Sequence, residues 1–332
     1  MTTQKIVFTA PNIVELLEEE VAPPQAHEFL VRAEVSLVST GTELIILGGN
    51  FEPNSHWANW VRYPMHPGYN MVGTVEHVGS DAPFQVGDRV ATRTSHRSLG
   101  KGDARTVKVP DDVSSDNAAW FGMANIAQNG VRRAEHRLGD AVVIIGAGLL
   151  GQLVTQYVRL QGAREIIVID PAPARLQMAR EHGATQTLDL AVQDARDAVF
   201  DWTQGRGADV VYDVTGHPAV LSAALPLARK FGTLLLLGDS AHPGEQRLTQ
   251  DVITRAVRII GAHDSNPPEA ASDRDPWSHI TMSELFFTYL QRGQMRVADM
   301  ETHRFKPHAA PAAYAQLQHD RSTAMGVLFD WR

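Results

Sequence analysis

Three glycines between residues 146 and 151 have the spacing of a turn that binds phosphate. In "VVIIGAGLLGQ", Gly146, Gly148 and Gly151 form a G-x-G-x-x-G pattern between a predicted buried strand and a predicted helix. The first glycine allows a tight turn, the second lets the backbone approach a pyrophosphate, and the third lets the helix pack closely on the strand. Free N–H groups at the helix N-terminus favour phosphate. The sequence therefore predicts a dinucleotide site, although an incidental glycine-rich turn is the alternative.

An acidic residue at the end of the next predicted strand indicates which dinucleotide binds. Asp170 closes "EIIVID" at the distance expected for the acid that binds the adenosine ribose. A carboxylate there accepts hydrogen bonds from the 2′-hydroxyl and repels a 2′-phosphate, which favours NAD over NADP. Arg175, the next arginine, could lie against the adenine face. We expect the other cofactor contacts to come from Leu149, Leu150, Thr215, Gly238 and Ala262.

Two different sequence patterns along the chain predict the strands and helices that position these residues. The first third contains short strands rich in Val and Thr, such as "FLVRAEVSLVS" and "MVGTVEHVG", which favour a small, mostly antiparallel barrel or sandwich. From residue 141 onward, buried strands alternate with amphipathic helices, which is typical of a doubly wound parallel sheet. The tail returns to a mixed pattern of helices and a closing strand. We therefore expect an α/β protein with domains at 1–117, 118–265 and a return to the first domain at 266–332.

Composition excludes several classes of protein. The chain has 332 residues, a net charge of −8 and no run of Lys or Arg, so it offers no basic surface for nucleic acid. It contains no cysteine, which excludes disulfides, thiolate zinc sites and thiol nucleophiles. No stretch approaches the ~20 apolar residues of a membrane span, and the first 20 residues lack the apolar core of a signal peptide, so we expect none. We expect a cytoplasmic protein with no membrane partner.

Motifs along nearly the whole chain resemble the medium-chain dehydrogenase/reductase superfamily. They are "VSTGTEL", "PGYNMVGTVEHVG", "VGDRV", "PDDVSSDNAAWFG", "IIGAGLLGQLVTQYVRLQGAREIIVID" and "THRFKPHAAPAAYAQL", in that order. The resemblance implies a GroES-like β-barrel catalytic domain around an inserted Rossmann domain, with the active site in the cleft between them. It also implies a homodimer or homotetramer. The "STGTE" variant is similar to the branch that contains bacteriochlorophyllide dehydrogenases.

The resemblance also implies which positions would hold the catalytic zinc of the family. Its three ligand positions fall on Thr40, Tyr69 and Gly122, and the glutamate beside its ligand histidine falls on Asn70. None of the three is a usual zinc donor, and the four-cysteine structural lobe is missing. The sequence therefore predicts neither a catalytic nor a structural zinc ion. The alternative is an unrelated metal site built from histidines among His56, His66, His77 and His96.

Without zinc, an alcohol that loses hydride needs hydrogen-bond donors and a base to stabilise its oxygen. Thr42 matches the hydroxyl that relays the proton in zinc-dependent members, and the phenol of Tyr69 could hydrogen-bond the reacting oxygen. Filling of the vacated volume is the alternative role for Tyr69. Glu43 and His66 are further candidate bases, although Glu43 stands where the family often uses an acid for structure. The candidates for a cation beside Tyr69 are His96, Arg97 and Lys101, of which Lys101 could equally be a solvated loop charge.

Aromatic and polar residues in neighbouring segments suggest the substrate. Trp57 and Trp120 offer flat apolar faces, and Thr40, Asn70 and Asn125 offer polar groups that suit a polyhydroxylated ring. Packing of the tryptophans on the barrel is an equal alternative. We therefore expect an NAD-dependent, zinc-independent dehydrogenase that oxidises a secondary alcohol of a sugar, polyol or cyclitol. A quinone or enoyl reductase and a non-catalytic cofactor-binding protein remain the alternatives.

Overall fold

The protein divides into two compact units in a computed structural model that describes residues 1–320 and 322–332. Unit 1 comprises residues 1–50, 56–123 and 268–332, and unit 2 comprises residues 51–55 and 124–267. The return of the chain to unit 1 at residue 268 lies close to the predicted boundary. The main crossing from unit 1 into unit 2 lies after Met123 instead of after residue 117, and the short segment 51–55 also belongs to unit 2.

The shift of this boundary has a local cause. The Ser115 hydroxyl donates to Glu34 Oε2 at 2.6 Å, which ties the short helix at this point to the first sheet. Trp120 is 1% exposed, and its ring leaves no space for a side chain at Gly326, near the C-terminus.

The segment 51–55 belongs to unit 2 because Glu52 makes two hydrogen bonds to that unit. Its N–H donates to the Ala241 carbonyl at 2.8 Å, and its carboxylate accepts the Gly244 N–H at 2.6 Å.

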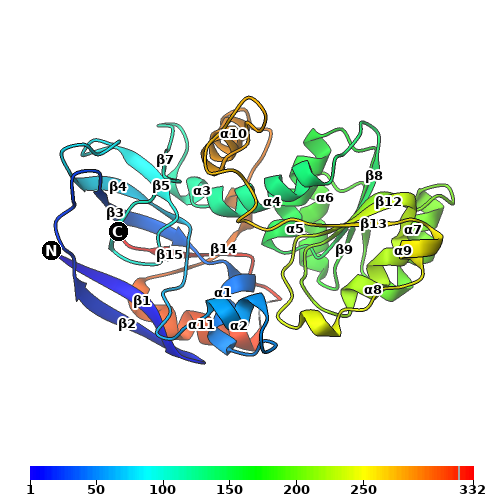
Figure 1. The fold of residues 1–332 in the computed structure, drawn as a ribbon, viewed down its shortest axis with the longest axis horizontal. Coiled ribbons are helices and arrows are strands. Elements are labelled where there is room, and N and C mark those ends of the chain that lie inside the picture. Colours follow the sequence, from blue (N-terminus) through cyan, green and yellow to red (C-terminus); the bar gives the residue numbers. More distant parts are fainter. Residues whose placement is uncertain (321) are drawn as a thin grey trace. The chain divides into compact units, whose positions relative to one another are not determined.

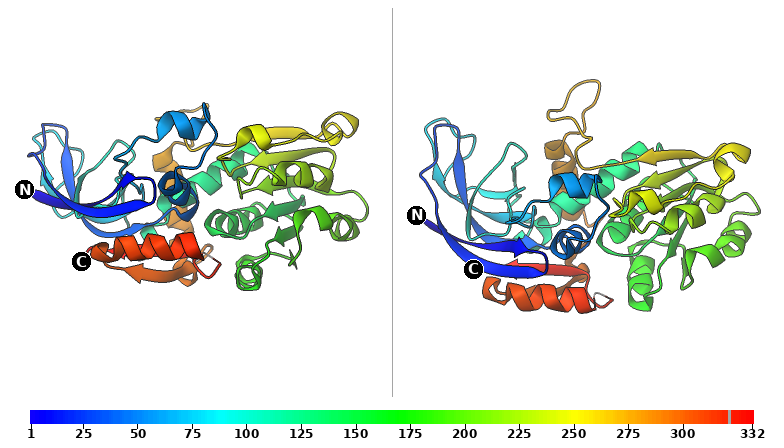
Figure 2. Two further views of the ribbon diagram at one scale, coloured as in Figure 1. Left: turned by 90° about the horizontal axis from the view of Figure 1, so that it is seen from below. Right: turned by 60° about the horizontal axis from the view of Figure 1, so that its bottom comes forward.

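Unit 1 contains a seven-stranded sheet and a separate hairpin. The sheet has the order β14-β15-β3-β4-β5-β7, with β6 paired to β3, and only β14 and β15 pair in parallel. The hairpin pairs β1 with β2, and β2 packs against α11 (Figure 2). The strands are β1 (Thr2–Ala10), β2 (Ile13–Glu20), β3 (Phe29–Leu37), β4 (Met71–Val78), β5 (Arg89–Thr92), β6 (Leu99–Lys101), β7 (Val107–Lys108), β14 (Glu301–Phe305) and β15 (Gly326–Asp330). This is the antiparallel-rich GroES-like domain that the sequence predicts.

Capping residues explain where two helices of unit 1 begin or end. Ser114 caps α3 through its side chain, which accepts the Asn117 N–H, and Gly49 ends α1 with a left-handed φ of 63°. The helices are α1 (Thr40–Gly48), α2 (His56–Trp60), α3 (Ser115–Ala118), the start of α4 (Phe121–Arg133), η4 (Ala298–Met300), η5 (Pro307–Ala309), α10 (His279–Gln291) and α11 (Ala310–His319).

Unit 2 is a doubly wound parallel sheet (Figure 1). Its strand order, β10-β9-β8-β11-β12-β13, is that of a Rossmann domain, as predicted. The strands are β8 (Ala141–Ile145), β9 (Glu165–Ile169), β10 (Gln186–Leu188), β11 (Ala208–Asp213), β12 (Ala228–Leu236) and β13 (Arg258–Gly261). The helices besides α4 are α5 (Leu149–Leu160), α6 (Pro173–His182), η1 (Val192–Asp194), α7 (Arg196–Trp202), α8 (Val220–Ala224), η2 (Leu225–Leu227), η3 (Pro243–Glu245) and α9 (Asp251–Thr254).

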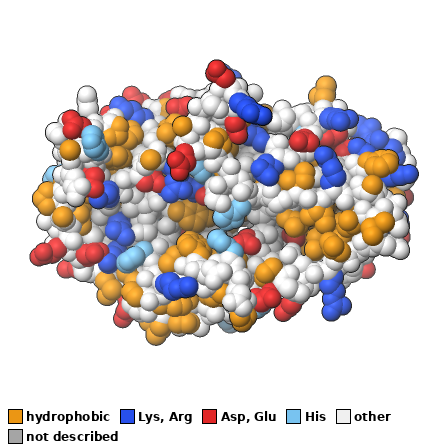
Figure 3. Space-filling model, in the orientation of Figure 1, with side chains coloured by type: hydrophobic (Ala, Val, Ile, Leu, Met, Phe, Trp, Pro, Cys, Tyr) orange, Lys and Arg blue, Asp and Glu red, His pale blue; other side chains and the backbone are white. Residues whose placement is uncertain are grey.

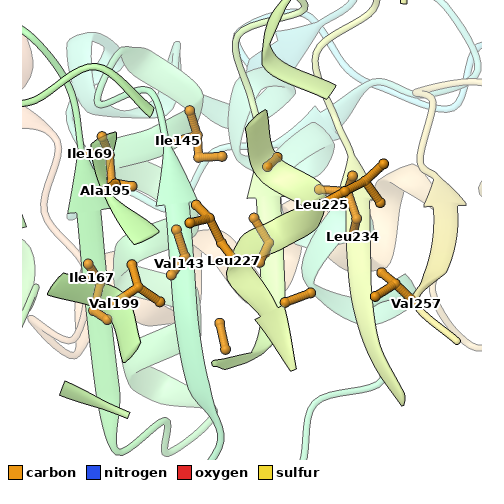
Figure 4. Close-up of a cluster of buried hydrophobic side chains, with 14 of the residues drawn as sticks. Val143, Ile145, Ile167, Ile169, Ala195, Val199, Leu225, Leu227, Leu234 and Val257 are labelled. Carbon is orange, nitrogen blue, oxygen red and sulfur yellow. The ribbon is translucent and has the colours of Figure 1, made fainter. Parts of the chain in front are cut away.

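The core of unit 2 fixes the ends of these strands. Val143, Ile145, Ile167 and Ile169 project from β8 and β9 into one buried cluster, and Leu234 joins it from β12 (Figure 4). All five are at most 2% exposed. A sheet buried in this way holds the loops at its carboxyl ends in fixed positions, which a cofactor site requires.

Acidic and basic side chains both occur over the face drawn in Figure 3. Among the residues that the structure describes, no helix has the length and apolar character needed to cross a bilayer.

Candidate functional site

The glycine loop of unit 2 has the shape that a dinucleotide needs. Gly146 has a left-handed φ of 100°, and a Cβ on Gly151 would lie only 1.9 Å from the Gly146 carbonyl oxygen. Neither position therefore tolerates a side chain. A Cβ on Gly148 would meet nothing within 4 Å, so the backbone there faces open space at the N-terminus of α5. The loop fits a pyrophosphate on its free N–H groups.

Asp170 is held rigidly at the end of β9. It is 5% exposed; Oδ2 accepts the Ala147 N–H at 2.8 Å, and Oδ1 accepts the Ala172 N–H at 2.8 Å. The carboxylate thus ties the glycine loop to the start of α6. Each carboxylate oxygen has two lone pairs, so both can still accept a ribose hydroxyl.

Gln152 is a positioning residue that the sequence analysis missed. Its side-chain amide donates to the carbonyls of Ala147 at 3.0 Å and Arg175 at 2.9 Å, and its oxygen lies 2.8 Å from His182 Nδ1. The buried amide therefore joins the glycine loop to α6. The signal for it was a polar residue directly after the third glycine, on the buried face of a helix.

The remaining predicted cofactor residues also lie at the carboxyl ends of the unit 2 strands. Thr215 follows β11, and its Cγ2 lies 2.9 Å from the position of a Cβ on Gly146. Gly238 follows β12, and Ala262, 6% exposed, follows β13. Leu149 and Leu150 begin α5, and Arg175 lies in the first turn of α6.

Asp213 is a further buried acid near this edge. Its Oδ1 accepts both the N–H and the hydroxyl of Thr215, at 2.9 and 2.6 Å. Its Oδ2 is buried and has no hydrogen-bond partner among residues 1–320 and 322–332. Burial raises the pKa of this carboxyl above its ordinary value, and the hydrogen bonds from Thr215 oppose that shift only in part.

In unit 1, the hydroxyl of Tyr69 contacts Ser39, a residue that the sequence analysis did not identify. The Tyr69 hydroxyl donates to Ser39 Oγ at 2.7 Å and also lies 3.6 Å from Met123 Sδ. Thr42 lies in the first turn of α1. The signal for Ser39 was its place directly before Thr40, one of the three mapped ligand positions.

A buried arginine that the sequence analysis did not identify lies beside Tyr69. The Arg93 Cζ atom is 5.2 Å from the centroid of the Tyr69 ring, and the residue is 8% exposed. A Cβ on Gly122 would lie 2.8 Å from Arg93 Nη1 and 2.0 Å from Asn70 Oδ1. Asn70 is fully buried, and its Oδ1 has no hydrogen-bond partner in the described part of the chain. The absence of a side chain at Gly122 therefore makes room for an amide and a guanidinium.

The surroundings of Glu43 favour the structural alternative over its predicted role as a base, because its carboxylate is enclosed. Glu43 is fully buried; Oε1 accepts the Ser39 N–H at 2.7 Å, and Oε2 accepts the Tyr314 hydroxyl and contacts His96 Nε2 at 3.1 Å. Burial, together with the Glu43 charge, raises the pKa of Tyr314 well above its usual range, so Tyr314 stays a donor. His96 Nδ1 in turn meets Ser36 Oγ at 2.7 Å. Glu43 thus holds α1 against its neighbours.

Two other predicted catalytic residues lie elsewhere in unit 1. Lys101, 56% exposed at its side chain, pairs with Glu28 and is a solvated charge, the alternative stated above. The side chain of His66 lies at the surface. It interacts electrostatically with Lys5 and Glu19 of the β1–β2 hairpin and with Arg97. Partial burial and the two cations lower its pKa. Neither residue has a described contact with Tyr69, so we no longer assign catalysis to them.

All the predicted substrate residues are largely buried in the structure. Trp120 is 1% exposed and packs on Gly326, which favours the alternative that this tryptophan packs in the core. Trp57 is 5% exposed in α2 and packs against Trp60, with ring centroids 5.8 Å apart. Thr40, 7% exposed, begins α1, and Asn125, 1% exposed, lies in α4.

The residues at the mapped zinc positions do not fit a zinc ion. A threonine hydroxyl, a phenol and a glycine provide no thiolate, imidazole or carboxylate. Asn70 and Arg93 fill the space beside Gly122, and a guanidinium cannot coordinate a cation. This set of side chains suits a negatively charged or polar oxygen.

Comparisons with known proteins agree with this architecture. Residues 25–133 match the alcohol dehydrogenase GroES-like domain, and residues 150–273 match the zinc-binding dehydrogenase family. A D-guloside 3-dehydrogenase of Escherichia coli K12 is 27% identical over 98% of this chain and 100% of its own. A sorbitol dehydrogenase of Bacillus subtilis is 32% identical over 68% of this chain and 73% of its own.

Solved structures share the fold. An oxidoreductase/dehydrogenase of unknown specificity from Escherichia coli superimposes with a TM-score of 0.84 at 20% identity, over 99% of both chains. An alcohol dehydrogenase from Escherichia coli CFT073, solved with NADH, gives a TM-score of 0.82 at 20% identity, over 99% of both chains. A zinc-binding dehydrogenase from Sinorhizobium meliloti, solved with NADP, gives 0.81 at 19% identity, again over 99% of both chains. With its paired family domains and its sorbitol dehydrogenase relative, the chain belongs to the zinc-binding alcohol dehydrogenase family within the medium-chain dehydrogenase/reductase superfamily.

Proposed function

We propose that this protein is an NAD-dependent dehydrogenase that oxidises a secondary alcohol of a sugar, polyol or cyclitol to a ketone without zinc. The observation that carries the proposal is the replacement of the metal site. Tyr69 and Gly122 are two of the three mapped ligand positions. The phenol of Tyr69, the amide of Asn70 and the guanidinium of Arg93 lie together there. These groups can bind and polarise an oxygen by hydrogen bonding.

The cofactor part of the proposal rests on unit 2. A bound nicotinamide dinucleotide would supply the hydride acceptor. Gly146, Gly148 and Gly151 give the pyrophosphate a backbone cradle, and Asp170 is fixed where a ribose hydroxyl would donate to it. The same carboxylate opposes a 2′-phosphate, which supports NAD over NADP.

The substrate class is supported by relatives. Two of the compared proteins are described as acting on a guloside and on sorbitol, both polyhydroxylated compounds. The polar groups Asn70 and Ser39 beside the accessible Tyr69 agree with a hydroxyl-rich ligand.

A two-part experiment tests the function. The purified protein is analysed for metals, treated with a chelator, and assayed for NAD reduction with a panel of sugars, polyols and cyclitols. We expect less than stoichiometric zinc and turnover that survives the chelator. About one zinc per chain with activity lost in chelator would overturn the zinc-free mechanism. NADPH-linked reduction of quinones or enoyl compounds would favour the reductase alternative, and no turnover of any substrate would favour a cofactor-binding protein.

A further inference from the structure

We propose that Arg93 is a catalytic residue whose guanidinium binds the oxygen of the reacting alcohol and supplies the fixed positive charge that a metal supplies in zinc-dependent members. The inference rests on the proposed function and adds to it the group that stabilises the alkoxide. It concerns unit 1 alone, where all the residues involved lie.

The position of Arg93 carries the inference. Its Cζ lies 5.2 Å from the Tyr69 ring centroid, and its Nη1 lies 2.8 Å from the place of a Cβ on Gly122. Tyr69 and Gly122 are two of the three mapped ligand positions. Ser39, which accepts the Tyr69 hydroxyl at 2.7 Å, directly precedes Thr40, the third. The guanidinium is therefore beside the place where the family holds its metal.

The chemistry of a guanidinium suits this place. Arginine stays protonated at all relevant pH values and has five N–H donors in a rigid fork, so it can stabilise an oxyanion but cannot act as the base. Arg93 is 8% exposed, and low exposure strengthens an electrostatic interaction because water screens it less. The fully buried Asn70 presents an acceptor beside the same cation, which helps to orient a substrate hydroxyl.

The proton must then go to another group. The Tyr69 O–H already donates to Ser39 Oγ, so the Tyr69 oxygen can accept a hydrogen bond from the substrate hydroxyl. In the proposed step the substrate O–H bond breaks and its proton passes to the Tyr69 oxygen. The Tyr69 hydroxyl proton passes at the same time to Ser39 Oγ, and the Ser39 hydroxyl proton is released to water. The C–H bond breaks with transfer of hydride to NAD, and the C–O bond becomes a carbonyl. Arg93 lowers the free energy of the alkoxide through which this occurs.

A purely structural role for Arg93 makes a different prediction. If the guanidinium only packs on the Tyr69 ring, its loss should lower stability without altering the pH dependence of catalysis. If it stabilises an alkoxide, its loss should shift the pH at which kcat/KM for oxidation reaches half its plateau to higher values. Arg93→Lys keeps the charge but loses the planar fork, and Arg93→Met keeps only the length.

The test compares Arg93→Met, Arg93→Lys and Arg93→Ala with Arg105→Met, which removes an exposed arginine that pairs with Asp103. We expect Arg93→Met to lower kcat about 100- to 1,000-fold, as the loss of one oxyanion donor does, while the NAD dissociation constant stays near wild type. Arg93→Lys should retain part of the activity, guanidinium ion in the buffer should partly rescue Arg93→Ala, and Arg105→Met should behave like wild type. Turnover of Arg93→Met within about threefold of wild type, with an unshifted pH profile, would overturn the inference.

A binding measurement keeps the inference separate from the proposed function. Acetate, as a small carboxylate that resembles an alkoxide oxygen, is titrated into the NAD complex of wild type and of Arg93→Met by calorimetry. Loss of acetate binding in the folded variant supports the oxyanion site even if no alcohol is oxidised, in which case only the proposed function fails. Equal acetate affinity in the two proteins, or no acetate binding by wild type, overturns the role of Arg93.

Discussion

Tyr69 donates the hydrogen of its hydroxyl to Ser39 Oγ across 2.7 Å. The phenol is therefore oriented by Ser39, the residue directly before α1. A tyrosine that merely filled the volume of a lost metal would need no such orientation. Removing the Tyr69 hydroxyl therefore distinguishes a role in catalysis from a role in filling volume.

The first prediction concerns this hydroxyl. Tyr69→Phe keeps the ring and removes only the oxygen, so we expect kcat to fall by at least about tenfold with little change in NAD affinity. The matched control is Tyr63→Phe, which removes a hydroxyl that donates to the Ile46 carbonyl of the same unit. Steady-state kinetics of both variants check this, and a Tyr69→Phe enzyme with the wild-type kcat would make Tyr69 a filler.

The parts of the protein that the sequence predicted are those with local causes. The glycine loop, its strand and Asp170 lie within 30 residues, and glycine spacing alone fixes the turn, so the parallel sheet of unit 2 and the place of this loop in it were predicted correctly. The strand β2 was missed because "IVELLEEE" is rich in glutamate and largely exposed, which hides its alternation. Helix α1 was missed because it begins with Thr-Gly-Thr, residues of low helix propensity.

The catalytic cluster was predicted only in part because its contacts are non-local. Arg93 and Tyr69 come from segments on either side of β4, and nothing in the spacing of either segment indicates that they meet. The sequence offered His96, Arg97 and Lys101 as candidate cations beside Tyr69, and not Arg93. It also could not show that Glu43 would be enclosed by Tyr314, which lies 271 residues away.

The second prediction concerns the space at Gly122. A methyl group there would meet Asn70 Oδ1 and Arg93 Nη1 at 2.0 and 2.8 Å, so Gly122→Ala should displace both groups. We expect it to lower stability by about 1–3 kcal/mol and to reduce kcat. Gly41→Ala in α1 is the control, since a Cβ at Gly41 meets nothing within 4 Å and alanine gains up to about 1 kcal/mol in a helix. Thermal unfolding checks both, and an equally stable Gly122→Ala would contradict the prediction.

The third prediction concerns assembly. Strand β13 lies at the edge of the unit 2 sheet, where its unpaired backbone groups offer a surface for a second copy of the chain. We propose a homodimer or homotetramer, and we expect Ile259→Pro to weaken it, because the Ile259 N–H faces away from β12 and proline removes this donor from the free edge of the strand. Light scattering at micromolar concentration should give at least twice 36.4 kDa for the wild type. A wild-type mass near 36.4 kDa would refute the proposal.

The fourth prediction concerns the buried carboxyl of Asp213. Because its folded-state pKa is raised, the ionised form is disfavoured, and this cost appears as pH rises from the ordinary value of 3.8 through the raised folded value. Below that window both states are protonated and the cost is absent. Asp213→Asn keeps an oxygen for Thr215 but cannot ionise, so its Tm relative to wild type should increase with pH across the window and then level off. A Tm difference that is constant from about pH 4 to 8 would show that the carboxyl titrates normally.

The fifth prediction concerns cofactor choice. Asp170 is fixed by two backbone N–H groups at 2.8 Å each, so it cannot swing away from a 2′-phosphate. We expect NAD to bind about 100-fold more tightly than NADP, a difference of a few kcal/mol. Asp170→Ala removes both the hydrogen bonds to the ribose and the repulsion, so NAD should weaken more than NADP and the ratio should narrow. Arg175→Ala, at the start of α6, should instead weaken both cofactors alike. Fluorescence titrations of the three proteins give the dissociation constants, and equal affinities of the wild type for NAD and NADP would refute this assignment.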